Sequence, residues 1–218
     1  PMGGEAGSIG DIATVRGGYA FKGSQFEEHG NPVVKIKNIV GDGTVKLTGT
    51  QCVDDAVAET AYRFQLNDGD LVMAMTGATV GKTGLVLTLG EKVFLNQRVA
   101  VFQSKYFGSK ISWFLFCLFA RKDIFDVVVG TAQGSAQPNI SSSGIEAVPI
   151  VVPAHEVLEK YLSITDGLFK SWLENNRQSE NLSSLRDTLL PKLLSGELSV
   201  SAAADQITKA KEAVNVQS

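Results

Sequence analysis

One stretch of the chain has nearly the residue types and spacing of a phosphate-binding loop. Residues 76–83 read TGATVGKT, but that loop needs a glycine where Thr76 stands. It also needs a helix after its lysine, so that backbone N–H groups point at a phosphate, whereas residues 83–87 read TGLVL and are typical of a strand. We therefore expect a strand, a turn and a second strand here, with Lys82 at the tip.

Residues suited to metal or nucleophilic chemistry are few and far apart. The two cysteines, Cys52 and Cys117, have no CxxC spacing, and the two histidines, His29 and His155, stand alone. Neither histidine is placed to act between a nucleophile and an acid. The sequence therefore predicts no catalytic residue, no metal site and no cofactor, and we expect both thiols to be buried and reduced.

A polar loop over residues 130–143 carries side chains that could read DNA. Gln133, Gln137 and Asn139 present paired donors and acceptors that suit adenine edges in the major groove, and the Ser135 hydroxyl suits a phosphate. An ordinary polar loop would have the same composition. The loop is a candidate for direct base recognition because of the elements around it.

The charge balance excludes non-specific binding of nucleic acid by bulk charge. Lys and Arg number 20 against 23 Asp and Glu, so the formal net charge is −3. Any DNA-binding face must be a local patch. The most apolar run, residues 111–120, is too short to cross a bilayer, and the start resembles no secretion signal. We expect a cytoplasmic protein without membrane contact, preceded by a flexible leader over residues 1–8.

Residues 9–153 have the pattern of a sheet-rich domain. Short apolar runs separated by Gly, Asn and Asp predict strands near residues 12–15, 33–36, 44–47, 71–75, 83–87 and 99–102. Apolar residues at spacings of three and four predict one helix between residues 108 and 128. A last strand is expected over residues 145–152, where two prolines suit an edge.

The pattern of residues 154–196 predicts a long helix, and we expect it to pack against a partner. At about 1.5 Å per residue, a helix over residues 155–194 would be roughly 60 Å long. A coiled-coil seam follows a 3.5-residue period, with polar Asn175 and Ser179 in its middle. A helix of this length can also pack on its own domain. Pro191 should kink or end it, and residues 197–218 predict a loose tail. The seam residues are Tyr161, Leu168, Trp172, Leu182, Leu189 and Leu193.

Four stretches together resemble one family, the specificity subunit of type I restriction-modification enzymes. They are GDIATVRGGYAFK at residues 10–22, DLVMAMTGATVGK at 70–82, GSAQPNI at 134–140 and LRDTLLPKLLSGEL at 185–198. The resemblance implies a target-recognition domain that reads DNA without catalysis, and a helical region where methyltransferase subunits dock and a restriction subunit joins.

The resemblance also implies two such domains and two helices, whereas this chain has one of each. Two copies could restore the whole by pairing their helices antiparallel and reading an inverted-repeat site. The C-terminal half of a longer subunit would have the same sequence pattern. The chain also has His155 and Glu156 where the family usually has a Glu-Gln pair.

The sequence thus predicts an α+β fold, a mixed sheet-rich target-recognition domain followed by a long coiled-coil helix. Its expected partners are double-stranded DNA, methyltransferase and restriction subunits, and a second copy of itself. Two alternatives remain: a coiled-coil scaffold that binds protein, and an enzyme that uses residues 76–83. The expected DNA-binding residues are Lys22, Lys35, Lys37, Lys82, Arg98, Gln133, Ser135, Gln137 and Asn139.

Overall fold

The computed structural model describes residues 4–104, 106–132 and 138–197. It has the predicted mixed α+β architecture, a sheet-rich domain followed by a long helix. The sequence placed the boundary between the two at residues 153 and 154. By packing, the chain divides into compact units after Lys170, so the first turns of the long helix pack with the sheet-rich unit.

The described elements alternate irregularly along the chain. The strands are β1 (Gly4–Ser8), β2 (Ala13–Gly17), β3 (Asn31–Val34), β4 (Gly43–Thr44), β5 (Cys52–Val53), β6 (Gln65–Leu66), β7 (Leu71–Ala74), β8 (Thr83–Leu85), β9 (Val93–Leu95), β10 (Val99–Ser104) and β11 (Pro149–Pro153). The helices are α1 (Ile9–Ile12), α2 (Asp55–Thr60), α3 (Ile111–Phe119), α4 (Lys122–Thr131), α5 (Ser142–Glu146) and α6 (His155–Leu194).

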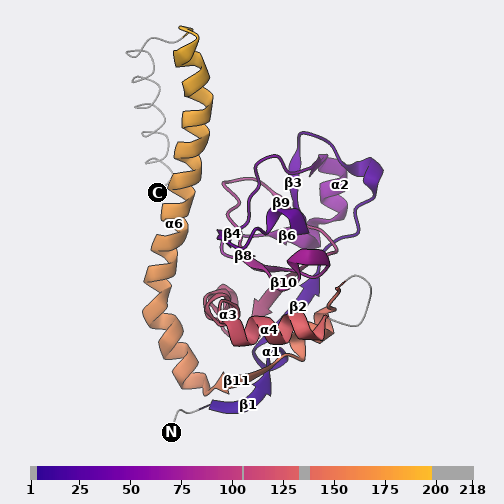
Figure 1. Ribbon diagram of the computed structural model, residues 1–218, viewed down its shortest axis with the longest axis vertical. Coiled ribbons are helices and arrows are strands. Elements are labelled where there is room, and N and C mark those ends of the chain that lie inside the picture. The colour runs from indigo at the N-terminus through magenta and orange to yellow at the C-terminus, as the bar shows by residue number, and fades with distance from the viewer. Residues whose placement is uncertain (1–3, 105, 133–137, 198–218) are drawn as a thin grey trace. The chain divides into compact units, whose positions relative to one another are not determined.

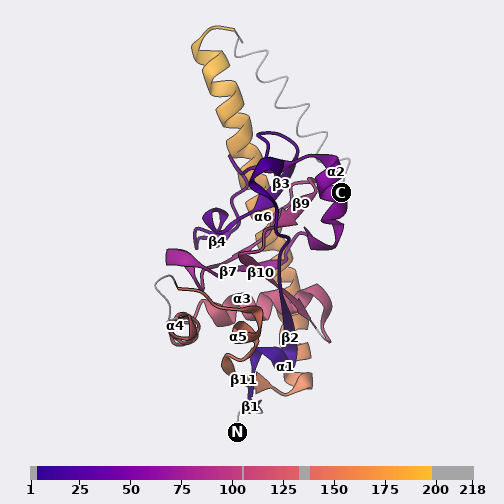
Figure 2. The same cartoon turned by 90° about the vertical axis from the view of Figure 1, so that its right-hand side faces the viewer.

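Three sheets build the first unit. The five-stranded sheet has the order β2-β10-β7-β8-β4, the four-stranded sheet the order β5-β3-β9-β6, and β1 pairs with β11. Most neighbours are antiparallel, but β4 runs parallel to β8 and β3 to β9, so the larger sheets are mixed. Figures 1 and 2 show α3 and α4 beside the five-stranded sheet, with the four-stranded sheet on its other side.

The middle strands of the five-stranded sheet are buried on both faces, which explains why they read as continuous apolar runs. In β10, Val99 and Val101 join the core that the two larger sheets share. Phe102 instead lies against Phe119 of α3, with ring centroids 5.2 Å apart. The strands predicted over residues 71–75 and 99–102 are confirmed as β7 and β10.

Several local predictions were wrong. The prediction of a flexible leader is wrong for residues 4–8, because Gly4–Ser8 forms strand β1, which pairs with β11. The helix predicted between residues 108 and 128 is two helices, because Arg121 has an extended backbone between α3 and α4. Ile145 belongs to α5 rather than to the last strand. Cys52 is buried as expected, but Cys117 is exposed on α3.

The helix predicted over residues 155–194 is confirmed as α6, and it continues three residues beyond Pro191. Gly196, with a φ of 76°, follows its end and donates its N–H to the Leu193 carbonyl. No helix within the described ranges is long and apolar enough to cross a membrane.

Candidate nucleic-acid interface

Segments far apart in the sequence meet at one edge of the five-stranded sheet, beyond the end of β7. The Met75 N–H donates to the Arg98 carbonyl at 3.0 Å, and the Met75 carbonyl accepts the Ile140 N–H at 2.9 Å. Thr76 and Asn139 form an antiparallel bridge next to this point. Arg98 and Asn139 are therefore both anchored beside Met75. We call the surface formed by Gln97, Arg98 and Asn139 the sheet-edge patch.

The turn between β9 and β10 holds Gln97 and Arg98 in place. The Val99 N–H donates to the Asn96 carbonyl at 3.0 Å, and the Asn96 side-chain oxygen accepts the Arg98 N–H at 3.3 Å. The Gln97 N–H donates to the Tyr19 carbonyl at 2.9 Å, which ties the turn to the segment after β2. The patch therefore rests on hydrogen bonds that hold its backbone, one of them accepted by the Asn96 side chain.

All three side chains of the sheet-edge patch are exposed. Two amides and one guanidinium are groups that meet base edges and phosphates in DNA complexes. Sequence reasoning selected Arg98 and Asn139 but missed Gln97. The polar run Asn96-Gln97-Arg98 between two apolar strands was the available signal. Gln133, Ser135 and Gln137, predicted to read DNA or bind phosphate, lie outside the described residues.

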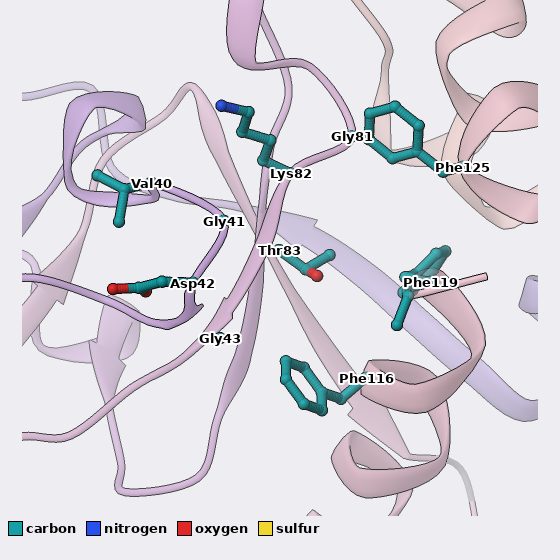
Figure 3. Close-up of a pocket in the computed structure, with 11 residues that line it drawn as sticks. Val40, Gly41, Asp42, Gly43, Gly81, Lys82, Thr83, Phe116, Phe119 and Phe125 are labelled. Atoms are coloured by element: carbon teal, nitrogen blue, oxygen red, sulfur yellow. The ribbon is translucent and has the colours of Figure 1, made fainter. Parts of the chain in front are cut away.

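Lys82 flanks the same end of β7 through the neighbouring strand, since its carbonyl accepts the Ala74 N–H at 3.0 Å. It is half-buried and lines a pocket of about 540 Å³ with Phe116, Phe119 and Phe125. Figure 3 shows its side chain extending away from the three phenyl rings. The ammonium group is therefore directed away from the apolar wall of the pocket.

The strand, turn and strand predicted around residues 76–83 are confirmed, because β7 and β8 pair antiparallel across them. Gly81 has a φ of 81°, and a Cβ atom there would come within 3.2 Å of Phe125 of α4. The hydroxyls of Thr76 and Thr79 are buried and make no hydrogen bond in the described structure. Neither hydroxyl is presented to a phosphate in solvent, unlike the hydroxyl of a phosphate-binding loop.

The remaining predicted cations, Lys22, Lys35 and Lys37, come from the segment between β2 and β4. The Lys35 side chain makes two contacts within the domain. Its Nζ lies 3.2 Å from the centroid of the Phe26 ring, and it donates a hydrogen bond to the Gln51 side chain. Burial, and next the neighbouring Lys37 charge, lower the pKa of Lys35. Lys22 and Lys37 are exposed. Lys35 is thus a predicted phosphate contact that is already bound to its own domain.

The predicted seam of α6 divides between the two units. Tyr161 is half-buried against α3, with its ring 5.9 Å from Phe114, whereas Leu168 is 69% exposed. Burial, and next a hydrogen bond with Cys117, raise the pKa of Tyr161 to about 12. The remaining seam residues belong to the second unit: Trp172, Leu182, Leu189 and Leu193.

The fold and this site define a class of protein in which a mixed-sheet domain with a polar sheet edge precedes a long helix. The chain belongs to the type I restriction modification DNA specificity domain family, which it matches over residues 2–182. The resemblance seen in the sequence is thereby confirmed.

Curated relatives agree with this family. The chain is 28% identical, over 92% of its length, to the type I restriction enzyme MjaIX specificity subunit of Methanocaldococcus jannaschii. It is 22% identical, over 91% of its length, to the HindI specificity subunit of Haemophilus influenzae. These matches cover 45% and 42% of the two relatives, so the chain spans about half their length.

Solved structures share the fold. The S subunit of a type I restriction-modification system from M. genitalium matches 89% of this chain with a TM-score of 0.57 and 16% identity. The HsdS subunit of Thermoanaerobacter tengcongensis matches 91% with a TM-score of 0.52 and 17% identity. In both cases the match covers 46% of the other chain.

Proposed function

We propose that this chain reads the sequence of double-stranded DNA for a type I restriction-modification complex and carries no catalysis itself. The observation that carries the proposal is the sheet-edge patch, which gathers Gln97, Arg98 and Asn139 in a member of a DNA specificity family. The formal net charge of −3 requires that DNA binding be local, and a patch of this kind is local.

Each side chain of the patch has its own role in this proposal. Asn139 and Gln97 carry amides that can donate and accept together, as adenine requires in the major groove. Arg98 supplies a charge for a phosphate, and Lys22, Lys37 and Lys82 are further candidates for phosphate contacts. Gln133, Ser135 and Gln137 precede Asn139 in the chain and complete the proposed reading loop.

The helix α6 supports the proposal of a helical partner. Within the first unit, Val157, Ile164 and Leu168 are exposed at spacings of seven and four, which places them on one stripe of the helix. The matched region covers 45% of the length of one curated relative, and a second copy could supply a second domain and a second helix. We infer an antiparallel homodimer in the cytoplasm that reads an inverted-repeat site and recruits methyltransferase and restriction subunits.

Two substitutions in the complex with methyltransferase test the reading surface. Asn139→Ala should relax preference at one base position by roughly tenfold, because one bidentate amide contact discriminates by about 1–3 kcal/mol. Arg98→Ala should weaken binding to all duplexes and reduce the slope of log affinity against log salt by about 0.9. The control is Lys92→Ala, which removes an exposed cation at the opposite end of β9.

Competition between the preferred duplex and random duplexes, at several salt concentrations, measures both effects. If Asn139→Ala and Arg98→Ala bind like Lys92→Ala, the sheet-edge patch is not the reading surface. Affinity for random duplexes that does not change between low and moderate salt would instead favour a protein-binding scaffold. Sedimentation of the chain tests the dimer: a monomeric wild type contradicts it, and Trp172→Asp is the dissociating control.

A further inference from the structure

The first four turns of α6 are joined to α3 by contacts of three kinds. The rings of Trp113 and Phe169 stack with centroids 4.7 Å apart and planes 10° from parallel. Lys110, directly before α3, forms an ion pair with Asp166 of α6 at 3.6 Å. The third contact is the edge-to-face packing of Tyr161 on Phe114, described above. We call these six residues the α3–α6 clamp: Lys110, Trp113, Phe114, Tyr161, Asp166 and Phe169.

Buried side chains of α3 and α6 surround the clamp. Trp113 is 5% exposed, and on α6 the side chains of Leu158 and Leu162 are 1% and 2% exposed. Since Leu158, Leu162 and Phe169 recur at helical spacing, one face of these turns is apolar and another carries the exposed stripe. The helix therefore has two separate faces, one covered by its own domain and one available to a partner.

The clamp is also connected mechanically to the sheet-edge patch. Ile111 and Leu115 of α3 are fully buried, and Phe119 packs against Phe102 of β10. Strand β10 begins at Val99, directly after Arg98. A continuous path of chain and packed side chains therefore leads from the patch through β10 and α3 to α6. The last clamp residue, Phe169, lies two positions before the second unit begins at Ser171.

From this arrangement we propose that the α3–α6 clamp holds the root of α6 at a fixed angle to the DNA-reading sheet and so determines which spacing between two half-sites the complex accepts. Phe169 and Trp113 are positioning residues in this scheme, because they stack on each other and act through the angle of the helix. The inference rests on the proposed function and adds the element that sets the spacing.

The geometry of DNA makes spacing sensitive to such an angle. Each added base pair moves the second half-site by about 3.4 Å and rotates it by about 35° around the duplex axis. With a rigid joint between reading domain and helix, the complex can bind both half-sites at one combination of distance and rotation. With a loose joint it can bind at several combinations, each with a lower effective concentration. Spacer preference therefore measures the stiffness of the joint, whereas preference within a half-site measures the patch.

The test uses the full-length chain assembled with methyltransferase, wild type and Phe169→Ala, on duplexes whose half-sites are separated by different numbers of base pairs. We expect Phe169→Ala to keep its base preference within each half-site. Its discrimination between the best spacer and one a base pair longer should fall by about tenfold. Phe169→Leu keeps apolar bulk without the ring stack and serves if the alanine variant folds poorly. Glu159→Ala, on an exposed position of α6, is the control.

A second measurement tests the stability of the clamp in the absence of DNA. Amide hydrogen exchange over residues 158–169 should be at least about tenfold faster in Phe169→Ala than in wild type, because local opening becomes easier. Unchanged spacer discrimination in Phe169→Ala, or an equal loss in Glu159→Ala, overturns the inference. A wild type without any base preference refutes the proposed function instead. In that case amide hydrogen exchange alone tests whether the clamp holds α6, and an unchanged exchange rate in Phe169→Ala contradicts it.

Discussion

The neighbouring glycines Gly17 and Gly18 allow a sharp test of how the sheet-edge patch is held. A Cβ atom on Gly18 would lie 2.2 Å from the Leu95 carbonyl oxygen and 2.5 Å from the Asn96 carbonyl oxygen. Both are backbone atoms, so no side-chain rotation relieves the clash. On Gly17 the nearest atom would be the Gln97 carbonyl oxygen at 3.5 Å, an ordinary contact. Gly18→Ala and Gly17→Ala are therefore matched variants with opposite expectations.

The cost of Gly18→Ala follows from the bonds that the methyl group would separate. Tyr19 donates to the Leu95 carbonyl at 2.8 Å and accepts the Gln97 N–H at 2.9 Å. Losing both costs about 2 kcal/mol, and overpacking adds about 1–3 kcal/mol. We expect the free energy of unfolding to fall by about 3–5 kcal/mol, a large part of the roughly 5–15 kcal/mol typical of a domain. Gly17→Ala should change it by less than about 1 kcal/mol.

Urea unfolding of the full-length chain, followed by circular dichroism, measures this difference. DNA competition at a temperature where both variants are folded adds a functional readout. Because the bonds at Tyr19 hold the turn that carries Gln97 and Arg98, Gly18→Ala should also lose base preference. If the two variants unfold within about 1 kcal/mol of each other, the tight contact between residue 18 and β9 is not what fixes this turn.

Three further predictions concern α6 and the cysteines. Gly167→Ala should raise the free energy of unfolding by about 1 kcal/mol, because this exposed helical glycine has open space where a Cβ would stand; a decrease in urea denaturation would contradict this. Tyr161 contributes stability that is fully present below its unfolded pKa near 10.0 and lost as pH rises towards its folded pKa of about 12. Wild type should therefore lose more stability than Tyr161→Phe between pH 9 and pH 11, and parallel pH profiles would refute the burial of this hydroxyl. Cys117 should react with a thiol reagent in the native state while Cys52 reacts after unfolding, and mass spectrometry of the modified peptides would detect the reverse order.

Local pattern was sufficient for the elements with strong periodicity. The apolar runs of β7 and β10 and the helical spacing of α6 predicted those elements nearly to their observed ends. It failed for two-residue strands such as β5 and β6, because so short a run has no period to detect. It also failed at Arg121 and Ile145, where the tertiary structure decides whether an apolar segment continues a helix, bends or pairs as a strand.

The candidate site was predictable by residue type but not by arrangement. Amides and cations in loops indicated Arg98 and Asn139, and both are exposed as DNA contacts require. Their meeting at Met75 depends on backbone pairing between residues 23 apart (Met75 and Arg98) and 65 apart (Met75 and Ile140), which no local pattern encodes. The same argument applies to Lys35, whose contacts with Phe26 and Gln51 join residues 9 and 16 positions away in the chain.

The sequence by itself determined the order of the parts: a sheet-rich domain, a polar loop and a long helix with an apolar seam. These follow from periodicity, turn residues and composition, which are properties of neighbouring residues. The tertiary structure alone decided that Gln97, Arg98 and Asn139 share one edge and that Trp113 stacks on Phe169. Such contacts arise because burying apolar surface and pairing backbone groups bring distant segments together, at a cost in chain entropy that only the whole fold offsets.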